Sequence, residues 1–237
     1  MRIIIVGRVA AGMSAATRLR RLSEKDEIIV FEKGPFVSFA NCGLPYHISK
    51  TIKHRSQLIV QTADDLRSRF NIDVRVNSEV THIDRDNKMI SVNHDDQQEK
   101  LYYDKLILSL GSSPVIPKIE GLHTQSNIFQ LRNIPDLDNI MSHLDESIKT
   151  VAVLGAGFIG IEVTENLIKR GFSVNLIERS NQILPNLDIE MAQSITNELI
   201  KNDVRINTGT TINKVSRDIL YLDNGMSIQA DAVIIAA

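Results

Sequence analysis

Two glycine-rich turns carry the clearest chemical signal in this chain of 237 residues. The second, GAGFIG at 155–160, is a complete G-x-G-x-x-G that follows an apolar run and opens a helical pattern. In that setting Gly155 permits the tight turn, Gly157 lets a pyrophosphate approach the backbone, and Gly160 lets helix and strand pack closely. The helix N-terminus then offers unpaired N–H groups to an anion. A strand–helix turn without a ligand is the alternative, and the acid that follows favours dinucleotide binding.

That acid is Glu178, which ends the next apolar run. A carboxylate at this place accepts hydrogen bonds from the adenosine ribose hydroxyls. It also repels a 2′-phosphate, which favours NADH. Arg179 follows directly and could accommodate such a phosphate, so NADPH stays open.

The first turn, GRVAAG at 7–12, is a degenerate version of the motif. Gly7 and Gly12 are present, but Val9 stands where the middle glycine belongs. The turn follows an N-terminal apolar run, and Glu32 ends the next one. This context favours a second and different dinucleotide, for which FAD is the usual partner of NAD(P)H.

Cys42 is the only cysteine. A lone cysteine is more often buried and inert than reactive. Its setting, SFANCGLPYHI at 38–48, is rich in residues that shape the backbone, and a helix beginning near 43–45 would favour the thiolate. No metal site is expected, because the histidines show no ligand spacing and one thiol cannot build a cage. His47 and His54 are expected to be surface or loop histidines.

Composition excludes several classes of protein. Hydrophobic residues make up 43% and charged residues 24%, as in ordinary globular proteins, and the net charge of −2 gives no nucleic-acid-binding footprint. No apolar run reaches the ~18–20 residues of a membrane span, and MRIIIVG is not a signal peptide. One cysteine rules out an internal disulfide and makes the cytoplasm the expected compartment.

Alternating strands and helices predict an α/β fold with two tandem Rossmann-like domains, 1–112 for FAD and 113–237 for NAD(P)H. Expected strands are 2–6, 28–31, 73–76, 89–93, 106–110, 150–154 and 173–177, with helices at 13–22 and 160–170. The first helix should bury Ala11, Ala15, Leu19 and Leu22. Residues 87–88 and the polar run 94–100 are expected to be hairpin turns, and 111–121 a boundary segment. The chain stops inside an apolar run, 230–237, which suggests a truncated protein with an incomplete first domain.

These motifs resemble the N-terminal half of the pyridine nucleotide–disulfide oxidoreductases. The matching segments are IIIVGRVAAGMSAATRLRRL (3–22), IIVFEKGPFVSFANCGLPYHI (28–48), YDKLILSLGSSP (103–114) and VAVLGAGFIGIEVTENLIKRGFSVNLIER (151–179). The chain is most similar to the single-cysteine branch, which includes coenzyme A-disulfide reductase, persulfide reductase and NADH oxidase/peroxidase. The resemblance implies that hydride passes from NAD(P)H to FAD and that electrons then pass to the cysteine sulfur.

The resemblance also implies roles for individual residues. Around FAD it places Gly7, Val9, Ala10, Ala11, Gly12, Glu32, Lys33, Val80 and Gly111. Around NADH or NADPH it places Gly155, Gly157, Phe158, Ile159, Gly160, Glu162, Glu178 and Arg179, with Phe158 covering the flavin ring and Glu162 near the nicotinamide.

The spacing around Cys42 reduces the number of reactions that the resemblance allows. Two-cysteine relatives carry C-x4-C, and His47 stands at the second position here. Cys42 must therefore cycle as a mixed disulfide with an external thiol, as a persulfide or as a sulfenic acid. Oxidase and peroxidase relatives carry a histidine in the first glycine turn, where this chain has Ala10. Reduction of CoA disulfide or CoA persulfide is therefore expected. An NADH oxidase or peroxidase using a cysteine sulfenic acid, or a non-catalytic nucleotide-binding fragment, are the alternatives.

Ser14, Arg18 and Arg21 share one face of the first expected helix. A solvated basic face is one interpretation. Arginines also suit the phosphates of coenzyme A, and the resemblance places CoA contacts on this helix and at Ser38 and Asn41. Relatives continue into a dimerisation domain, so a homodimer is expected for the full-length protein.

Overall fold

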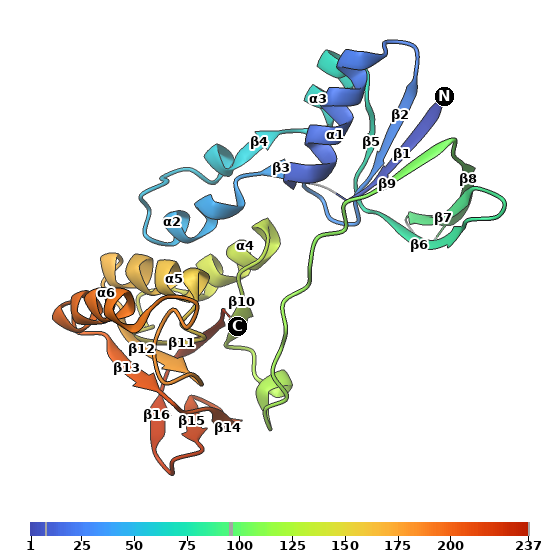
Figure 1. Cartoon of the computed structure of the whole chain (residues 1–237). Coiled ribbons are helices and arrows are strands. Elements are labelled where there is room, and N and C mark those ends of the chain that lie inside the picture. The colour runs from blue at the N-terminus through green and yellow to red at the C-terminus, as the bar shows by residue number, and fades with distance from the viewer. Residues whose placement is uncertain (8, 95–96, 237) are drawn as a thin grey trace. The chain divides into compact units, whose positions relative to one another are not determined.

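The computed structural model describes residues 1–7, 9–94 and 97–236, and the chain divides into two compact units (Figure 1). Unit 1 comprises Met1–Ala40 and Ser56–Ser112, and unit 2 comprises Asn41–Arg55 and Ser113–Ala237. The sequence placed residues 41–55 in the first domain, whereas in the structure they pack within unit 2. The assignment of 1–112 to FAD and 113–237 to NAD(P)H remains a prediction.

Unit 1 is built on a four-stranded parallel sheet. Its order is β5 (Asp73–Arg75), β2 (Glu27–Phe31), β1 (Arg2–Val6) and β9 (Lys105–Leu108). Helices α1 (Val9–Leu22) and α3 (Ala63–Phe70) cover one face, and the antiparallel strands β6 (Ser78–Asp84), β7 (Met89–His94) and β8 (Gln97–Tyr102) cover the other (Figure 1). Short strands β3 (Ser38–Phe39) and β4 (Ile59–Gln61) pair beside α1, and Arg55–Leu58 form a 3-10 turn.

Successive residues of the central strands face opposite layers, which explains their uninterrupted apolar runs. Ile5, Ile28 and Val30 pack on the helical side, while Ile4, Ile29 and Phe31 pack against the β6–β8 side. Burial on both faces leaves no position for polar residues. The expected parallel α/β fold is confirmed for this unit.

Two details of unit 1 differ from expectation. Of the polar run 94–100, His94 ends β7 and residues 97–100 belong to β8, which pairs with β7 and carries exposed polar side chains, while residues 95 and 96 lie outside the described part of the chain. The expected Ala15 and Leu19 pack against the core, but the fully buried residues of α1 are Gly12, Met13 and Ala16, whereas Ala11 is exposed and Leu22 is 65% exposed. Close approach of Gly12 to the turn below sets the rotation of the helix, and this turns Met13 and Ala16 inward.

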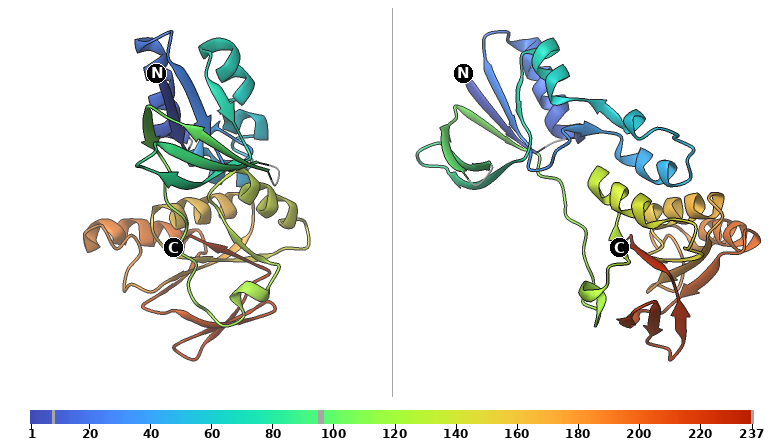
Figure 2. Two further views of the ribbon diagram at one scale, coloured as in Figure 1. Left: turned by 90° about the vertical axis from the view of Figure 1, so that its right-hand side faces the viewer. Right: turned by 180° about the vertical axis from the view of Figure 1, so that it is seen from behind.

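Unit 2 is also built on a parallel sheet, here of five strands. Its order is β10 (Ile128–Gln130), β17 (Ala232–Ile235), β11 (Thr150–Leu154), β12 (Ser173–Glu178) and β13 (Arg205–Thr208). The apolar run at 230–237 thus supplies β17, a strand buried between two neighbours. Helices α5 (Phe158–Lys169) and α6 (Ile189–Lys201) lie on one face of this sheet, with α4 (Ile134–His143) beside α5 (Figure 2).

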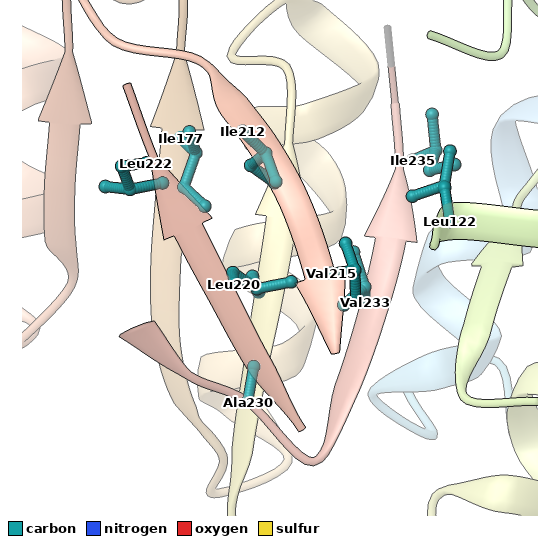
Figure 3. Packing of buried hydrophobic residues seen from close by; sticks show 10 residues of the cluster. Leu122, Ile177, Ile212, Val215, Leu220, Leu222, Ala230, Val233 and Ile235 are labelled. Carbon is teal, nitrogen blue, oxygen red and sulfur yellow. The ribbon is translucent and has the colours of Figure 1, made fainter. Parts of the chain in front are cut away.

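A second, antiparallel sheet covers the opposite face of unit 2. It consists of β14 (Ile212–Ser216), β15 (Ile219–Leu222) and β16 (Ser227–Gln229). Figure 3 shows Val215 of this sheet next to Val233 of the parallel sheet, and Leu222 and Ile212 on either side of Ile177. The remaining elements are the 3-10 turns Asn41–Gly43 and Leu122–Thr124 and the short helix α2 (Leu44–Ile48).

Candidate functional site

The second glycine turn has the geometry that its sequence predicts. Gly155 has a φ of +102°, and its N–H donates to Ile177 O at 2.8 Å, so the turn is tied to the neighbouring strand. A Cβ on Gly160 would lie 1.9 Å from Gly155 O, which only glycine avoids. The strand, turn and helix therefore approach as closely as a dinucleotide-binding motif requires.

Gly157 precedes α5 and leaves the start of that helix open. It has a φ of −74°, it makes no side-chain cap, and a Cβ placed there meets nothing within 4 Å. Phe158 and Ile159 follow it with 60% and 52% of their surface exposed. The first N–H groups of this 12-residue helix thus face open space, an arrangement that fits a pyrophosphate.

Glu178 is held under the turn at the tip of β12. Its Oε2 accepts the Ala156 N–H and its Oε1 accepts the Ser180 N–H, both at 2.8 Å, and the side chain is 7% exposed. Burial opposes ionisation, but the backbone hydrogen bonds from Ala156 and Ser180, together with the Ser180 side chain and the charge of Arg179, hold the pKa of Glu178 below its usual value. Each oxygen keeps lone-pair capacity for a ribose hydroxyl. Arg179 beside it is exposed, and Glu162 on α5 is half-buried.

The first glycine turn shares this framework. Gly7 has a φ of +101° and donates to Phe31 O at 2.9 Å, and a Cβ on Gly12 would lie 2.5 Å from Gly7 O. Glu32 is 5% exposed and accepts the Gly34 N–H at 2.7 Å. The likeness to the second turn supports a nucleotide here as well.

The middle position is where the first turn departs from the second. Val9 adopts a φ of +63°, and its N–H donates to Val37 O at 3.0 Å, so this donor is already partnered. Ala10 and Ala11 are exposed at the start of α1. The other residues assigned to FAD by resemblance lie in unit 1: Lys33 is exposed, Val80 is half-buried in β6, and Gly111 is exposed with a φ of +68°.

Cys42 is a free, exposed thiol in the 3-10 turn that leads into α2. Gly43 caps α2, and Pro45 occupies its first turn, so the helix start that the sequence indicated is present. Asn41 beside it is exposed. The sulfur is therefore reachable by a solute and is not sealed in packed hydrocarbon.

His47 differs from the expectation of a surface histidine. It is 9% exposed on α2, and its Nδ1 donates to Ile52 O at 2.8 Å. Because a carbonyl only accepts, this bond fixes the proton on Nδ1. His54 is exposed, as expected.

The expected CoA contacts fall in both units. Ser14, Arg18 and Arg21 are all exposed along α1, so they do share one solvent-facing surface, and Ser38 is half-buried in β3. All four belong to unit 1, whereas Asn41 and Cys42 belong to unit 2.

Two arginines that the sequence did not single out join the segment around Cys42 to other elements of unit 2. Arg170, after the end of α5, donates to Ile48 O, and Arg55 forms a bidentate ion pair with Asp138 of α4. These contacts join residues far apart in sequence. No local pattern could have indicated them.

In the part of the chain that the structure describes, no cluster of His, Cys, Asp and Glu is arranged to hold a metal ion. Within the same residues, no helix combines the length and apolar character needed to span a bilayer.

The structure has two parallel sheets, and in each a glycine turn joins one strand to a helix and an acid follows at the tip of the next strand. This arrangement defines a tandem dinucleotide-binding α/β protein. The family model of pyridine nucleotide-disulphide oxidoreductases matches residues 1–237, and the chain belongs to this family.

Individual relatives agree with this assignment. Coenzyme A disulfide reductase of Staphylococcus aureus (strain COL) is 35% identical over 98% of this chain and 53% of its own length. NADH oxidase of Methanocaldococcus jannaschii is 33% identical over 100% of this chain and 54% of its own length. The chain thus spans about half the length of the curated relatives it matches.

Solved structures show the same architecture. The reduced Bacillus anthracis CoADR-RHD has a TM-score of 0.97 and 42% identity, over 99% of this chain and 43% of that one. The NAD-dependent persulfide reductase from A. fulgidus has a TM-score of 0.93 and 30% identity, over 100% of this chain and 46% of that one. The predicted tandem α/β fold is therefore confirmed.

Proposed function

We propose that this chain is part of a flavin-dependent NAD(P)H oxidoreductase that reduces CoA disulfide, or a CoA persulfide, through Cys42. The observation that carries the proposal is a single exposed thiol at the start of a helix with no second cysteine anywhere in the sequence. The relatives named coenzyme A disulfide reductase and persulfide reductase support a sulfur substrate.

The two turns supply the cofactor sites of this proposal. FAD would lie on 7–12 with Glu32, and NADH or NADPH would lie on 155–160 with Glu178. Supporting this, the second turn faces open space at Gly157 and its acid is held in place by Ala156 N–H. When bound, the flavin accepts a hydride from the nicotinamide and passes two electrons to sulfur.

The thiol chemistry then follows from Cys42 having no partner in the chain. Its thiolate attacks one sulfur of CoA disulfide, the S–S bond breaks, and one CoA thiolate leaves and takes a proton. The product is a mixed disulfide between Cys42 and CoA. Two electrons, supplied ultimately by NAD(P)H, cleave that bond and restore the Cys42 thiolate as the second CoA leaves. The balance is one disulfide and one NAD(P)H with a proton giving two thiols and NAD(P)⁺.

Recognition of CoA would use the exposed surface of α1. Arg18 and Arg21 offer guanidinium groups to phosphates, with Ser14, Ser38 and Asn41 as polar contacts. We place the protein in the cytoplasm, where free thiols persist, and expect a homodimer for the full-length protein.

Mass spectrometry of protein purified without reductant tests this function. A CoA-sized adduct should map to Cys42, disappear on reduction, and be absent from Cys42→Ser. Failure to form an adduct under any oxidising condition would remove CoA from the proposal.

An NADH oxidase or peroxidase is the second candidate, favoured by the relative named NADH oxidase. An exposed Cys42 could cycle through a sulfenic acid. Ala10, at the place where such relatives carry a histidine, argues against it. NADH consumption driven by oxygen or peroxide alone would favour this candidate, and a colourless protein that still binds NADH would indicate a nucleotide-binding fragment.

A further inference from the structure

We propose that Arg170 and the Arg55–Asp138 ion pair are positioning residues that hold residues 41–55, here called the cysteine segment, against helices α5 and α4. Cys42 would then keep a fixed place relative to the helix that carries the second glycine turn. The proposal rests on the proposed function for the role of Cys42, but its structural part stands on contacts within unit 2.

The cysteine segment packs into unit 2 through an apolar layer. Leu44, Pro45 and Ile48 of α2 are buried, and α2 contacts both α5 and α4 (Figure 2). The hydrogen bond from His47 Nδ1–H to Ile52 O holds the residues that follow α2 against this helix. An isolated helix of five residues is not stable in water, so the conformation and position of α2 depend on the residues it packs against.

Arg170 joins three helices through one guanidinium. Its Nη1 donates to Ile48 O at 3.3 Å, and its Nη2 donates to Leu144 O at 2.7 Å. Ile48 is the last residue of α2 and Leu144 is the C-cap of α4, so both carbonyls lie at helix ends that carry partial negative charge. A planar guanidinium can serve both acceptors at once.

The remaining contacts of Arg170 show that it sits in packed surroundings. The guanidinium carbon lies 5.5 Å from the ring centroid of Phe172, and Nη1 lies 3.2 Å from the Met141 sulfur. Burial lowers the pKa of Arg170, as expected for a cation partly removed from water. Loss of this side chain would leave helix-end carbonyls without a donor.

The Arg55–Asp138 pair ties down the other end of the cysteine segment. Arg55 Nε lies 2.6 Å from Asp138 Oδ1, and Nη2 lies 2.7 Å from Oδ2, which is the bidentate geometry. Both side chains are 41% exposed, so this pair is the weaker of the two ties. Together the contacts hold the segment to α4 at Arg55 and to α4 and α5 at Ile48.

Amide hydrogen exchange measured on the whole protein tests the positioning directly. In Arg170→Ala, exchange of amides 44–52 should rise by about tenfold or more, the effect of losing hydrogen bonds from a charged donor. Amides of β11 and β12 should be unchanged. Arg170→Lys should give an intermediate rise, because an ammonium cannot span two carbonyls in the same way. Lys169→Ala is the matched control, since Lys169 is exposed and pairs with Glu165 on the same helix.

A charge exchange between Arg55 and Asp138 gives a second, milder test that does not depend on Arg170. Arg55→Asp should raise exchange in 50–56, and adding Asp138→Arg should restore protection. Unchanged exchange of the cysteine segment in both Arg170→Ala and Arg55→Asp, or an equal rise across β11 and β12, would overturn the proposal.

Rapid-mixing kinetics separate positioning from the reaction itself. Arg170→Ala should slow the step that depends on CoA disulfide by about tenfold, while reduction of the flavin by NADH keeps its rate. Equal slowing of both steps would contradict a role at Cys42. If the wild-type protein does not reduce CoA disulfide, the proposed function fails, and the exchange data still decide whether Arg170 holds the segment.

Discussion

The Glu178 carboxylate accepts the Ala156 N–H at 2.8 Å, so the acid at the tip of β12 is bonded into the glycine turn that follows β11. Its other oxygen accepts the Ser180 N–H at 2.8 Å. One side chain thereby fixes the turn, the strand end and the direction of its own lone pairs. A negative charge placed this way contributes to folding.

Glu178→Gln should therefore destabilise the protein in a pH-dependent way. The folded pKa of Glu178 lies below its unfolded value, so its contribution is complete above the unfolded value of about 4.3 and is lost as pH falls through the folded pKa. We expect the variant to lose about 1 kcal/mol of unfolding free energy near neutral pH, because a charge-assisted hydrogen bond becomes a neutral one. Urea unfolding at a series of pH values measures this.

The difference between wild type and Glu178→Gln should shrink as the pH falls through the folded pKa of Glu178, because both side chains are then neutral. Glu165→Gln is a suitable control, since Glu165 is a surface residue on α5. A difference that grows on acidification would show that the sign of the pKa shift is wrong.

Strands and turns were predictable because their signals are local. The strand at 150–154 has the bounds expected from its apolar run, and the glycine spacing placed both turns correctly. The pairing of β8 with β7 was not predictable, because the side chains of β8 are mostly exposed and polar and therefore resemble those of a loop.

The surroundings of Cys42 could not be predicted from the sequence. Burial of His47 and the packing of residues 41–55 in unit 2 depend on partners distant in the chain. Arg170 and Ile48 are separated by 122 positions, and Arg55 and Asp138 by 83. The residue types at these positions are ordinary, so only their three-dimensional placement gives them a role.

The two glycines of the second turn should respond differently to a methyl group. Gly160→Ala would place Cβ 1.9 Å from Gly155 O, so we expect a loss of about 3 kcal/mol in unfolding free energy. Gly157→Ala meets nothing within 4 Å and should cost less than about 1 kcal/mol. Thermal unfolding distinguishes them.

Gly157→Ala, which should cost little stability, should instead weaken the binding of NADH. Folded Gly157→Ala should bind NADH about tenfold more weakly, because the methyl occupies the space expected for the pyrophosphate. Unchanged affinity in a titration of NADH fluorescence would place the cofactor elsewhere.

Thr164 is a buried hydroxyl in α5 whose Oγ1 has no hydrogen-bond partner among the described residues. Valine has nearly the same shape without the polar group, so Thr164→Val should stabilise the protein by about 1 kcal/mol. Thr196→Val is the control, because that hydroxyl donates to Ala192 O at 2.9 Å and should show no gain. A loss of stability in Thr164→Val would mean that the hydroxyl has a partner, such as a buried water.

Choice between NADH and NADPH should depend on the charges at 178 and 179. In Glu178→Gln the repulsion of a 2′-phosphate is removed while exposed Arg179 remains, so the ratio of the NADPH to the NADH dissociation constant should fall by at least about tenfold. Arg179→Ala in the Glu178→Gln background should reverse that gain by weakening NADPH alone, because NADH carries no 2′-phosphate for the guanidinium to meet. Fluorescence titrations of both nucleotides against the three proteins give the ratios. An unaltered ratio in Glu178→Gln would show that the adenosine ribose does not reach this carboxylate.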